Sequence, residues 1–361
     1  MSKIISIGTA VPAHRHAQPA ILDFMQRVYA LNDDDGRKLR FLYRKGGIDY
    51  RYSVIPDYSL SAGEWQFYPS SENLEPFPSL EQRMSWYRKY AGQLSLEAVV
   101  NCRNRVKDAA ITHLITVSCT GMSAPGLDLE LLELLELPAT TFRTSINFMG
   151  CYAAIHALKI ADAFCKADSK ANVLIVCTEL CTLHFQKEHS IDNITSSMLF
   201  GDGSAAMLVS GDTTRAGLQV DHFYSTVAVK GKKDMAWELS SSGFLMTLSG
   251  YVADLIEEDF EGLVRSALID AGMNKEDIGH WCIHPGGKKI LEAVHKSLEF
   301  TNGQLQPCYD VLRDHGNMSS PTVLFVLEKI MHSLEGRTGK ENIFGAAFGP
   351  GLTMETFILS T

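Results

Sequence analysis

Short apolar runs alternate with longer amphipathic segments along most of this chain. The runs are rich in β-branched and aliphatic residues, as half-buried or buried strands are, and the segments between them have the spacing of helices. The runs lie at 4–7, 111–117, 173–177, 205–209, 220–229, 280–284 and 342–348. This alternation predicts an α/β or layered α-β-α protein.

Three sequence features recur in the same order in the two parts of the chain. They pair ITHLITVSCTG (111–121) with IGHWCIHPGG (278–287), GCYAAIHALKIADAF (150–164) with GNMSSPTVLFVLEKI (316–330), and FGDGSAAMLVS (200–210) with FGPGLTMETFIL (348–359). The first two pairs are offset by 167 and 166 residues and the third by 148, so an insertion follows the first long helix. Such an internal repeat predicts two related halves, which we place at 1–215 and 216–361.

Composition narrows the class of protein. The 361 residues are 45% hydrophobic and 21% charged with a net charge of −9, which is typical of a globular protein and disfavours broad attraction to nucleic acid or an anionic membrane. The start MSKIISIGTAVPAH reads as a strand, and no apolar stretch reaches the roughly 20 residues that span a bilayer. Eight scattered cysteines without a C-x-x-C pair indicate reduced thiols. We therefore expect a cytoplasmic protein with no membrane insertion and no metal site.

Cys151 is the cysteine with the most distinctive position. It follows Gly150 and begins an apolar helix-like segment. A thiol at a helix N-terminus is close to the positive end of the dipole and to unpaired N–H groups, which lower its pKa and can bind an oxyanion. A buried structural thiol is the alternative interpretation.

Two further residues complete a possible catalytic set. His284 ends the run HWCIH and precedes Pro285-Gly286-Gly287, so the imidazole is expected at the carboxyl end of a strand, where clefts form in α/β folds. Asn317 matches Cys151 in the repeat and is expected at a helix start, where an N-cap is the simpler role. Together, Cys, His and Asn can supply a nucleophile, a base and donors to a thioester oxygen.

Two other motifs suggest ligand binding. FGDGSAA at 200–206 imitates a dinucleotide fingerprint, but the segment after it reads as a short strand rather than a helix, so we reject that interpretation. The run RKLRFLYRK at 37–45 gathers basic residues in an acidic chain and could hold the phosphates of a nucleotide-bearing carrier, although a solvated helix face explains it equally well.

Across essentially its whole length the chain resembles the type III polyketide synthases, the chalcone and stilbene synthase-like enzymes. The resemblance rests on GCYAA, LFGDGSAA, IHPGG, GNMSS and FGPGLTMET, in the order of the family. It implies a thiolase-like fold, with two duplicated halves in a five-layer α-β-α-β-α sandwich, and a homodimer. It also implies an acyltransferase that uses malonyl-CoA and an acyl-CoA starter without a further cofactor.

The resemblance assigns roles to individual residues. Cys151, as a thiolate paired with an imidazolium at His284, would carry the acyl chain, while His284 and Asn317 would stabilise the enolate left when malonyl-CoA loses carbon dioxide. Phe200 matches a gatekeeper phenylalanine. The implied substrate pocket comprises Phe200, Met246, Trp237, His184, Cys119, Cys181, Ala124, Ser319, Gly349 and Pro350. The implied CoA-binding residues are Lys38 and Lys45, with Arg40 or Arg44 replacing a third basic position.

Departures from the plant pattern concern the product. Trp237 stands where plant enzymes have a small glycine and His184 where they have a threonine, so we expect a small cavity and a short, cyclised product of the pyrone or resorcinol type. A ketoacyl synthase III-like or hydroxymethylglutaryl-CoA synthase-like enzyme shares the fold and nucleophile and remains an alternative. A catalytically inactive thiolase-fold binding protein is a second one.

Overall fold

A computed structural model describes residues 1–361 apart from positions 30, 72, 107 and 302. Its first half contains β1 (Ser2–Ala10), α3 (Leu80–Arg103), β4 (His113–Ser118), α4 (Leu127–Leu134), β5 (Phe142–Asn147), α5 (Ala153–Ala167), β6 (Asn172–Leu180) and β7 (Asp202–Ser210). The second contains β8 (Leu218–Val227), α7 (Val252–Asp270), β11 (His280–Ile283), α8 (Lys288–Ser297), α9 (Gln306–His315), α10 (Thr322–Leu334), β12 (Asn342–Gly349) and β13 (Thr353–Ser360).

The two halves repeat one strand order. The first half reads β1-β7-β6-β4 and the second β8-β13-β12-β11, and a short antiparallel pairing of β1 with β8 joins them into one mixed sheet that ends at β5. The paired sequence features fall on equivalent elements, because β4 corresponds to β11, α5 to α10 and β7 to β13. The predicted boundary at 215/216 falls in the loop between β7 and β8.

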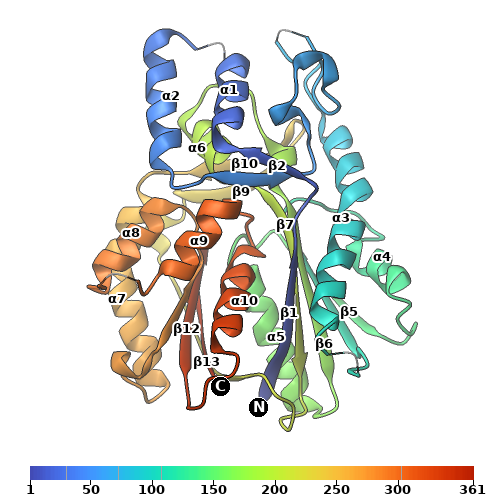
Figure 1. Ribbon diagram of the computed structural model, residues 1–361, viewed down its shortest axis with the longest axis vertical. Helices are drawn as coiled ribbons and strands as arrows, with labels where there is room; N and C mark the ends of the chain where they lie inside the picture. The colour runs from blue at the N-terminus through green and yellow to red at the C-terminus, as the bar shows by residue number, and fades with distance from the viewer. Residues whose placement is uncertain (30, 72, 107, 302) are drawn as a thin grey trace.

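Helices enclose and separate the two parts of this sheet (Figure 1). α3 and α4 cover one outer face, α7 and α8 cover the other, and α5 and α10 lie between strands of both halves. Helix α5 contacts β6 and also β13, while α10 contacts β11 and also β1. This is the expected five-layer α-β-α-β-α arrangement.

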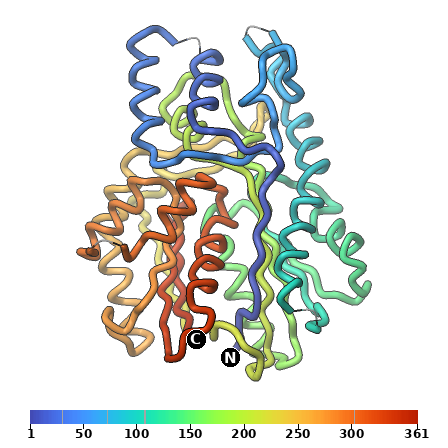
Figure 2. Tube along the Cα trace, in the orientation of Figure 1, coloured from blue at the N-terminus to red at the C-terminus, as the bar shows by residue number. Residues whose placement is uncertain are grey.

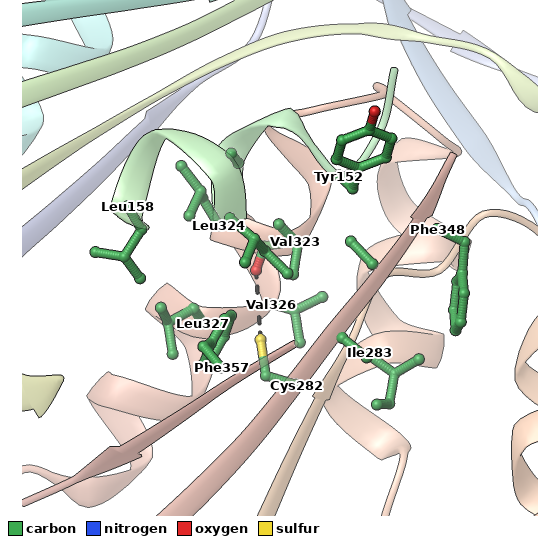
Figure 3. Close-up of a cluster of buried hydrophobic side chains, with 14 of the residues drawn as sticks. Tyr152, Leu158, Cys282, Ile283, Val323, Leu324, Val326, Leu327, Phe348 and Phe357 are labelled. Carbon is green, nitrogen blue, oxygen red and sulfur yellow. Dashed lines mark hydrogen bonds between the residues drawn. The ribbon is translucent and has the colours of Figure 1, made fainter. Parts of the chain in front are cut away.

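The central layer explains why α10 is apolar around most of its circumference. Val323, Leu324, Val326 and Leu327 are all buried in it, and Figure 3 shows these side chains packed among residues of β11, β12, β13 and α5. Cys282 on β11 donates from Sγ to the Val323 carbonyl over 3.5 Å. A helix covered by sheet on two sides needs apolar side chains over most of its surface, as this sequence provides.

A smaller layer caps one end of the sandwich, away from the two termini, which lie close together at the other end (Figure 2). It contains β2 (His14–Ala17), α1 (Gln18–Val28), α2 (Asp33–Lys45), β3 (Tyr50–Ser53), α6 (Ile191–Leu199) and the hairpin of β9 (Met235–Ser240) and β10 (Gly243–Leu248). The strand-like runs did not predict β2, β3, β5, β9 or β10, which are short or carry polar residues at exposed positions. Among the described residues, no helix is long and apolar enough to cross a membrane.

Candidate active site

The half-buried Cys151 lies just before the central helix α5, at the end of the sandwich that the cap covers. Its neighbour Gly150 has φ +84°, and a Cβ there would lie 2.3 Å from Cδ of Pro350. A Cβ on Gly349 would lie 2.5 Å from Cδ1 of Tyr152 and 3.4 Å from the Cys151 nitrogen. The turn between β12 and β13 therefore approaches the cysteine segment closely, and glycine is required on both sides of this contact.

His284 directly follows β11 and is almost completely buried, with 1% of its surface exposed. Its backbone N–H donates to the Ala346 carbonyl over 2.8 Å, so the ring is held at the end of the sheet. Neither ring nitrogen has a hydrogen-bond partner among the described residues. A buried imidazole with both nitrogens free is a group held ready for a ligand or a proton.

Asn317 does not lie at a helix start, contrary to the expectation from the repeat. Helix α10 begins at Thr322, after Pro321, so the second half has extra residues between the matched position and its helix. The Asn317 side chain accepts the Ser319 N–H over 2.8 Å and donates to the Gly286 carbonyl over 3.2 Å. These bonds fix the amide and leave one of its two N–H donors available.

Burial makes each charge at Cys151 or His284 unfavourable when it stands alone. It raises the pKa of the Cys151 thiol to about 11, against smaller opposing effects of Ser319 and Asn317, and it lowers the pKa of His284 to about 3. A thiolate and an imidazolium are stabilised in a dry cavity only as neighbours, since each then compensates the other. A thiolate at Cys151 together with an imidazolium at His284 would therefore cost less here than either charge alone.

One cavity of about 370 Å³ brings these three residues together. Seven other predicted pocket residues also line it, namely Phe200, Met246, Trp237, Cys119, Cys181, Ser319 and Pro350. Sequence reasoning missed most of its apolar lining, which includes Met198, Leu199, Met235, Leu248, Val252, Ile290 and Phe348. These residues come from six elements, and nothing in the local sequence marks them as neighbours.

Three predicted pocket residues do not line this cavity. Gly349 lies behind it against Tyr152, and Ala124 is exposed in the loop after β4. His184 is buried and structural: Nε2 bonds to the Thr120 carbonyl over 2.8 Å, Nδ1 accepts the Phe244 N–H, and the ring stacks on Phe244. The side chain thus fastens β10 to the loop after β4 instead of facing the substrate space.

A second, smaller space, which we call the rear chamber, lies behind the cavity. Its volume is about 40 Å³, and His184, Arg51, Ser53, Thr182 and Ser197 are among its lining residues. It shares the side chains of Cys181, Phe200, Trp237 and Met246 with the main cavity. These four residues therefore form the partition between the two spaces.

Of the four basic residues predicted to bind CoA, Lys45 lines the cavity. Lys38 is exposed and bonds to Asp35 over 2.8 Å, and neither Arg40 nor Arg44 is part of the cavity lining. Lys288 and Lys289, at the start of α8, line the cavity although they were not selected from the sequence. The PGGKK run after His284 could have indicated these two lysines, because they directly follow the loop that carries the histidine.

Glu179 on β6 was also missed. Its carboxyl group is buried and accepts hydrogen bonds from the Cys119 N–H (2.9 Å), Thr120 Oγ1 (2.8 Å) and Ser320 Oγ (2.9 Å). Burial raises its pKa to about 7, although these hydrogen bonds oppose the shift. A lone acidic residue in the apolar strand NVLIVCTEL was the available signal.

Among the residues that the structure describes, no three His, Cys, Asp or Glu side chains are grouped as metal ligands. The lining of the cavity offers a thiol, an imidazole and an amide beside an apolar wall, and it includes three lysines.

Comparisons with known proteins agree with this geometry. Residues 1–213 match the family described as chalcone and stilbene synthases, N-terminal domain, and residues 221–361 match the corresponding C-terminal domain. The chain is 27% identical to 3,5-dihydroxyphenylacetyl-CoA synthase of Streptomyces toyocaensis. The match covers 99% of this chain and 89% of that protein. The chain is 28% identical over 98% of its length to probable polyketide synthase 1 of Dictyostelium discoideum, but spans only 11% of that protein.

A solved structure extends the similarity to the fold. The crystal structure of PKS-I from the brown alga Ectocarpus siliculosus superposes with a TM-score of 0.92 and 25% identity, covering 99% of this chain and 97% of the other. Together with the two domain matches, this confirms the thiolase-like α/β fold and the resemblance seen in the sequence. The chain belongs to the chalcone and stilbene synthases, the type III polyketide synthases, which are acyltransferases that carry out decarboxylative condensation.

Proposed function

We propose that this chain builds a small cyclised polyketide by repeated condensation of malonyl-CoA onto an acyl group held as a thioester on Cys151. The observation that carries the proposal is the single cavity lined by Cys151, His284 and Asn317. CoA thioesters are its substrates, and the reaction draws on no other cofactor.

In the loading step, Cys151 Sγ attacks the thioester carbonyl of the starter. A new S–C bond forms, and the CoA thiolate leaves with the proton that His284 had taken from Cys151. The unpartnered ring nitrogens of His284 support this role, because the imidazole is free to accept and return that proton.

In the extension step, malonyl-CoA loses carbon dioxide and the electrons of the broken C–C bond form an enolate. His284, which is neutral again after loading, donates its one ring N–H, and Asn317 donates its free N–H, to the thioester oxygen where negative charge develops. The apolar Phe200 ring beside them disfavours the malonyl carboxylate and favours its loss. The enolate carbon then attacks the Cys151 thioester, a C–C bond forms, and the thiolate is released for the next cycle.

The cavity wall supports a short product. Trp237 and Met246 are opposed on the β9–β10 hairpin, and both side chains line the cavity. A bulky pair at this place limits the length of chain that can fold before it cyclises. The expectation of a pyrone or resorcinol type of product thus rests on Trp237, and His184 contributes only by holding β10.

We further propose that CoA lies across the lysines at the cavity margin. Lys45 on α2 and Lys288 and Lys289 on α8 line it from two elements, which suits a phosphate-bearing carrier in an otherwise acidic chain. Lys38, Arg40 and Arg44 would contribute only to the long-range electrostatic attraction of the CoA phosphates.

We propose a homodimer in the cytoplasm. Among the described residues, strand β5 pairs only with β4 and so forms an edge of the large sheet, and Phe142 at its start is 54% exposed. An apolar residue on an unpaired edge favours association with a second copy. All eight cysteines are free, which suits a reducing compartment. Light scattering of wild type and Phe142→Asp tests the dimer, and a monomer for the wild type would refute it.

The central experiment incubates the protein with malonyl-CoA and a panel of short, long and aromatic starter CoAs, with products identified by mass spectrometry. We expect small cyclised polyketides from the wild type and none from Cys151→Ala. Products that persist in Cys151→Ala would overturn the proposed nucleophile.

A further inference from the structure

Phe200 directly follows helix α6, and its carbonyl oxygen accepts a hydrogen bond from a buried guanidinium. Arg51 on β3 is only 4% exposed, and its Nη1 donates to that oxygen over 2.6 Å. One residue earlier, the Leu199 carbonyl accepts the N–H of Asn317, and the Gly201 N–H donates back to the Asn317 carbonyl, both over 2.9 Å. Arg51 therefore holds the short segment that is bridged directly to Asn317.

Gln18, the first residue of α1, ties Arg51 to the same helix end. Its Oε1 accepts from Arg51 Nε and its Nε2 donates to the Met198 carbonyl, each over 2.9 Å. The last carbonyl groups of a helix have no partner within it, and the end carries partial negative charge, so outside donors and a cation stabilise it. Two side chains from the N-terminal part of the chain thus cap α6 where it leads into Phe200.

The stem of Arg51 also fills the space beside two glycines that flank these residues. A Cβ on Gly316, where φ is +69°, would lie 2.9 Å from Arg51 Cγ, and one on Gly201 would lie 3.5 Å from Arg51 Cβ. Among the described residues Arg51 forms no ion pair within 4.0 Å. The Phe200 carbonyl and Gln18 thus use Nη1 and Nε of the buried guanidinium, while Nη2 has no hydrogen-bond partner among the described residues.

We infer that Arg51, oriented by Gln18, is a positioning residue that sets the place of the Phe200 ring and the Asn317 amide across the cavity. This inference rests on the proposed function, in which those two groups act on the malonyl carboxylate and thioester. Displacement of such groups by about 1 Å can slow a step about a hundredfold. Loading of Cys151 depends chiefly on the thiol and His284, neither of which is hydrogen-bonded to Arg51 among the described residues. Asn317 has only a minor effect on the thiol, so Arg51 acts mainly on decarboxylation.

The test measures the two steps separately in Arg51→Met, which keeps an unbranched stem and removes every N–H donor. Release of carbon dioxide from malonyl-CoA reports decarboxylation, and intact-protein mass after a single turnover reports acylation of Cys151 by a starter CoA. We expect decarboxylation to fall at least about tenfold and acylation to stay within about threefold. Equal losses in both steps would overturn the inference, because a merely structural residue lowers both together.

Arg83→Met is the matched control. Arg83 is also fully buried, and it donates from Nε to the Pro78 carbonyl and from Nη1 to the Phe185 carbonyl, each over 3.0 Å, with no bond to the Phe200–Asn317 bridge. We expect a comparable loss of thermal stability with the ratio of the two rates unchanged. A shifted ratio in this control would mean that the assay reports general destabilisation, and the inference would fall.

Two milder variants serve if Arg51→Met does not fold. Arg51→Lys keeps the charge, but a single ammonium group cannot donate to the Phe200 carbonyl and to Gln18 in the same geometry. Gln18→Leu removes the side chain that orients Arg51. Both are expected to lose decarboxylation selectively, and proportionate losses in both would count against the inference. A wild type that does not decarboxylate malonyl-CoA at all would instead refute the proposed function.

Discussion

The indole Nε1–H of Trp237 donates a hydrogen bond of 2.7 Å to the carbonyl oxygen of Cys119. It joins β9 of the cap to the segment that follows β4 of the sandwich. On its other side the indole meets the ring of His184 edge-on, and that ring is itself bonded to the backbone. Trp237 is therefore a fixed part of the partition between the cavity and the rear chamber, and cannot swing aside easily.

Removing the indole should lengthen the product. In Trp237→Gly the cavity and the rear chamber join, so we expect products with at least one more malonyl unit, measured by mass spectrometry with a single starter. Trp237→Phe is the control, because it keeps an aromatic wall and loses only the bond to Cys119, and its main product should match the wild type. A folded Trp237→Gly with the wild-type product would show that another residue sets the length.

Replacing His284 should leave the half-buried thiol of Cys151 without its proton acceptor. Since burial raises the pKa of this thiol to about 11 despite the hydrogen bonds of Ser319 and Asn317, the thiolate fraction of His284→Ala at pH 7 is only about one ten-thousandth. We expect alkylation of Cys151 by iodoacetamide at pH 7 to slow at least about a hundredfold, and to rise steadily with pH above 8. The wild type should instead react readily at neutral pH.

His295→Ala, on α8 and outside the cavity lining, controls for general effects of losing an imidazole and should react as the wild type does. If the alkylation profile of His284→Ala coincided with that of the wild type, the two groups would not ionise together, and the proton transfer proposed for loading would be wrong.

Charge reversal at the cavity margin should weaken CoA binding. For Lys45→Glu, Lys288→Glu and Lys289→Glu we expect KM for malonyl-CoA to rise about tenfold with a much smaller change in kcat, because binding remote from the reacting atoms is lost. Lys296→Glu, at an exposed site paired with Glu257, is the control and should leave KM unchanged. Lys38→Glu decides whether the sequence-based assignment of Lys38 is right, since Lys38 does not line the cavity.

Glu179 should make the stability of the fold depend on pH. Its pKa is about 7 in the folded protein and 4.5 without burial, so folding favours the protonated form. The contribution of Glu179 to the free energy of unfolding is greatest below pH 4.5. It falls by about 3 kcal/mol in total as the pH rises through 7. Glu179→Gln keeps the hydrogen-bonding shape without the charge, so its Tm should drop less than that of the wild type between pH 5 and pH 8. Parallel Tm curves for the two proteins would contradict this.

Local sequence determined much of the architecture. Each of the seven apolar runs became a strand, because alternation and β-branched residues act within a few neighbours. The repeat predicted equivalent elements in the two halves, and Gly150 before an apolar helix marked Cys151. His284 followed from a strand that ends at Pro-Gly-Gly. These signals lie within short windows, so they can be interpreted without knowing which distant segments meet.

The tertiary structure decided what surrounds those residues. Sequence placed Asn317 at a helix start, whereas pairing with Leu199 and Gly201 holds it in an extended bridge. It placed His184 in the pocket, whereas backbone groups from two other elements bind both its ring nitrogens. The hydrogen bond from Arg51 to the Phe200 carbonyl joins positions that are 149 residues apart in the sequence. Such contacts depend on how the cap packs onto the sandwich, and the free energy of that packing is distributed over many residues, so no local pattern encodes it.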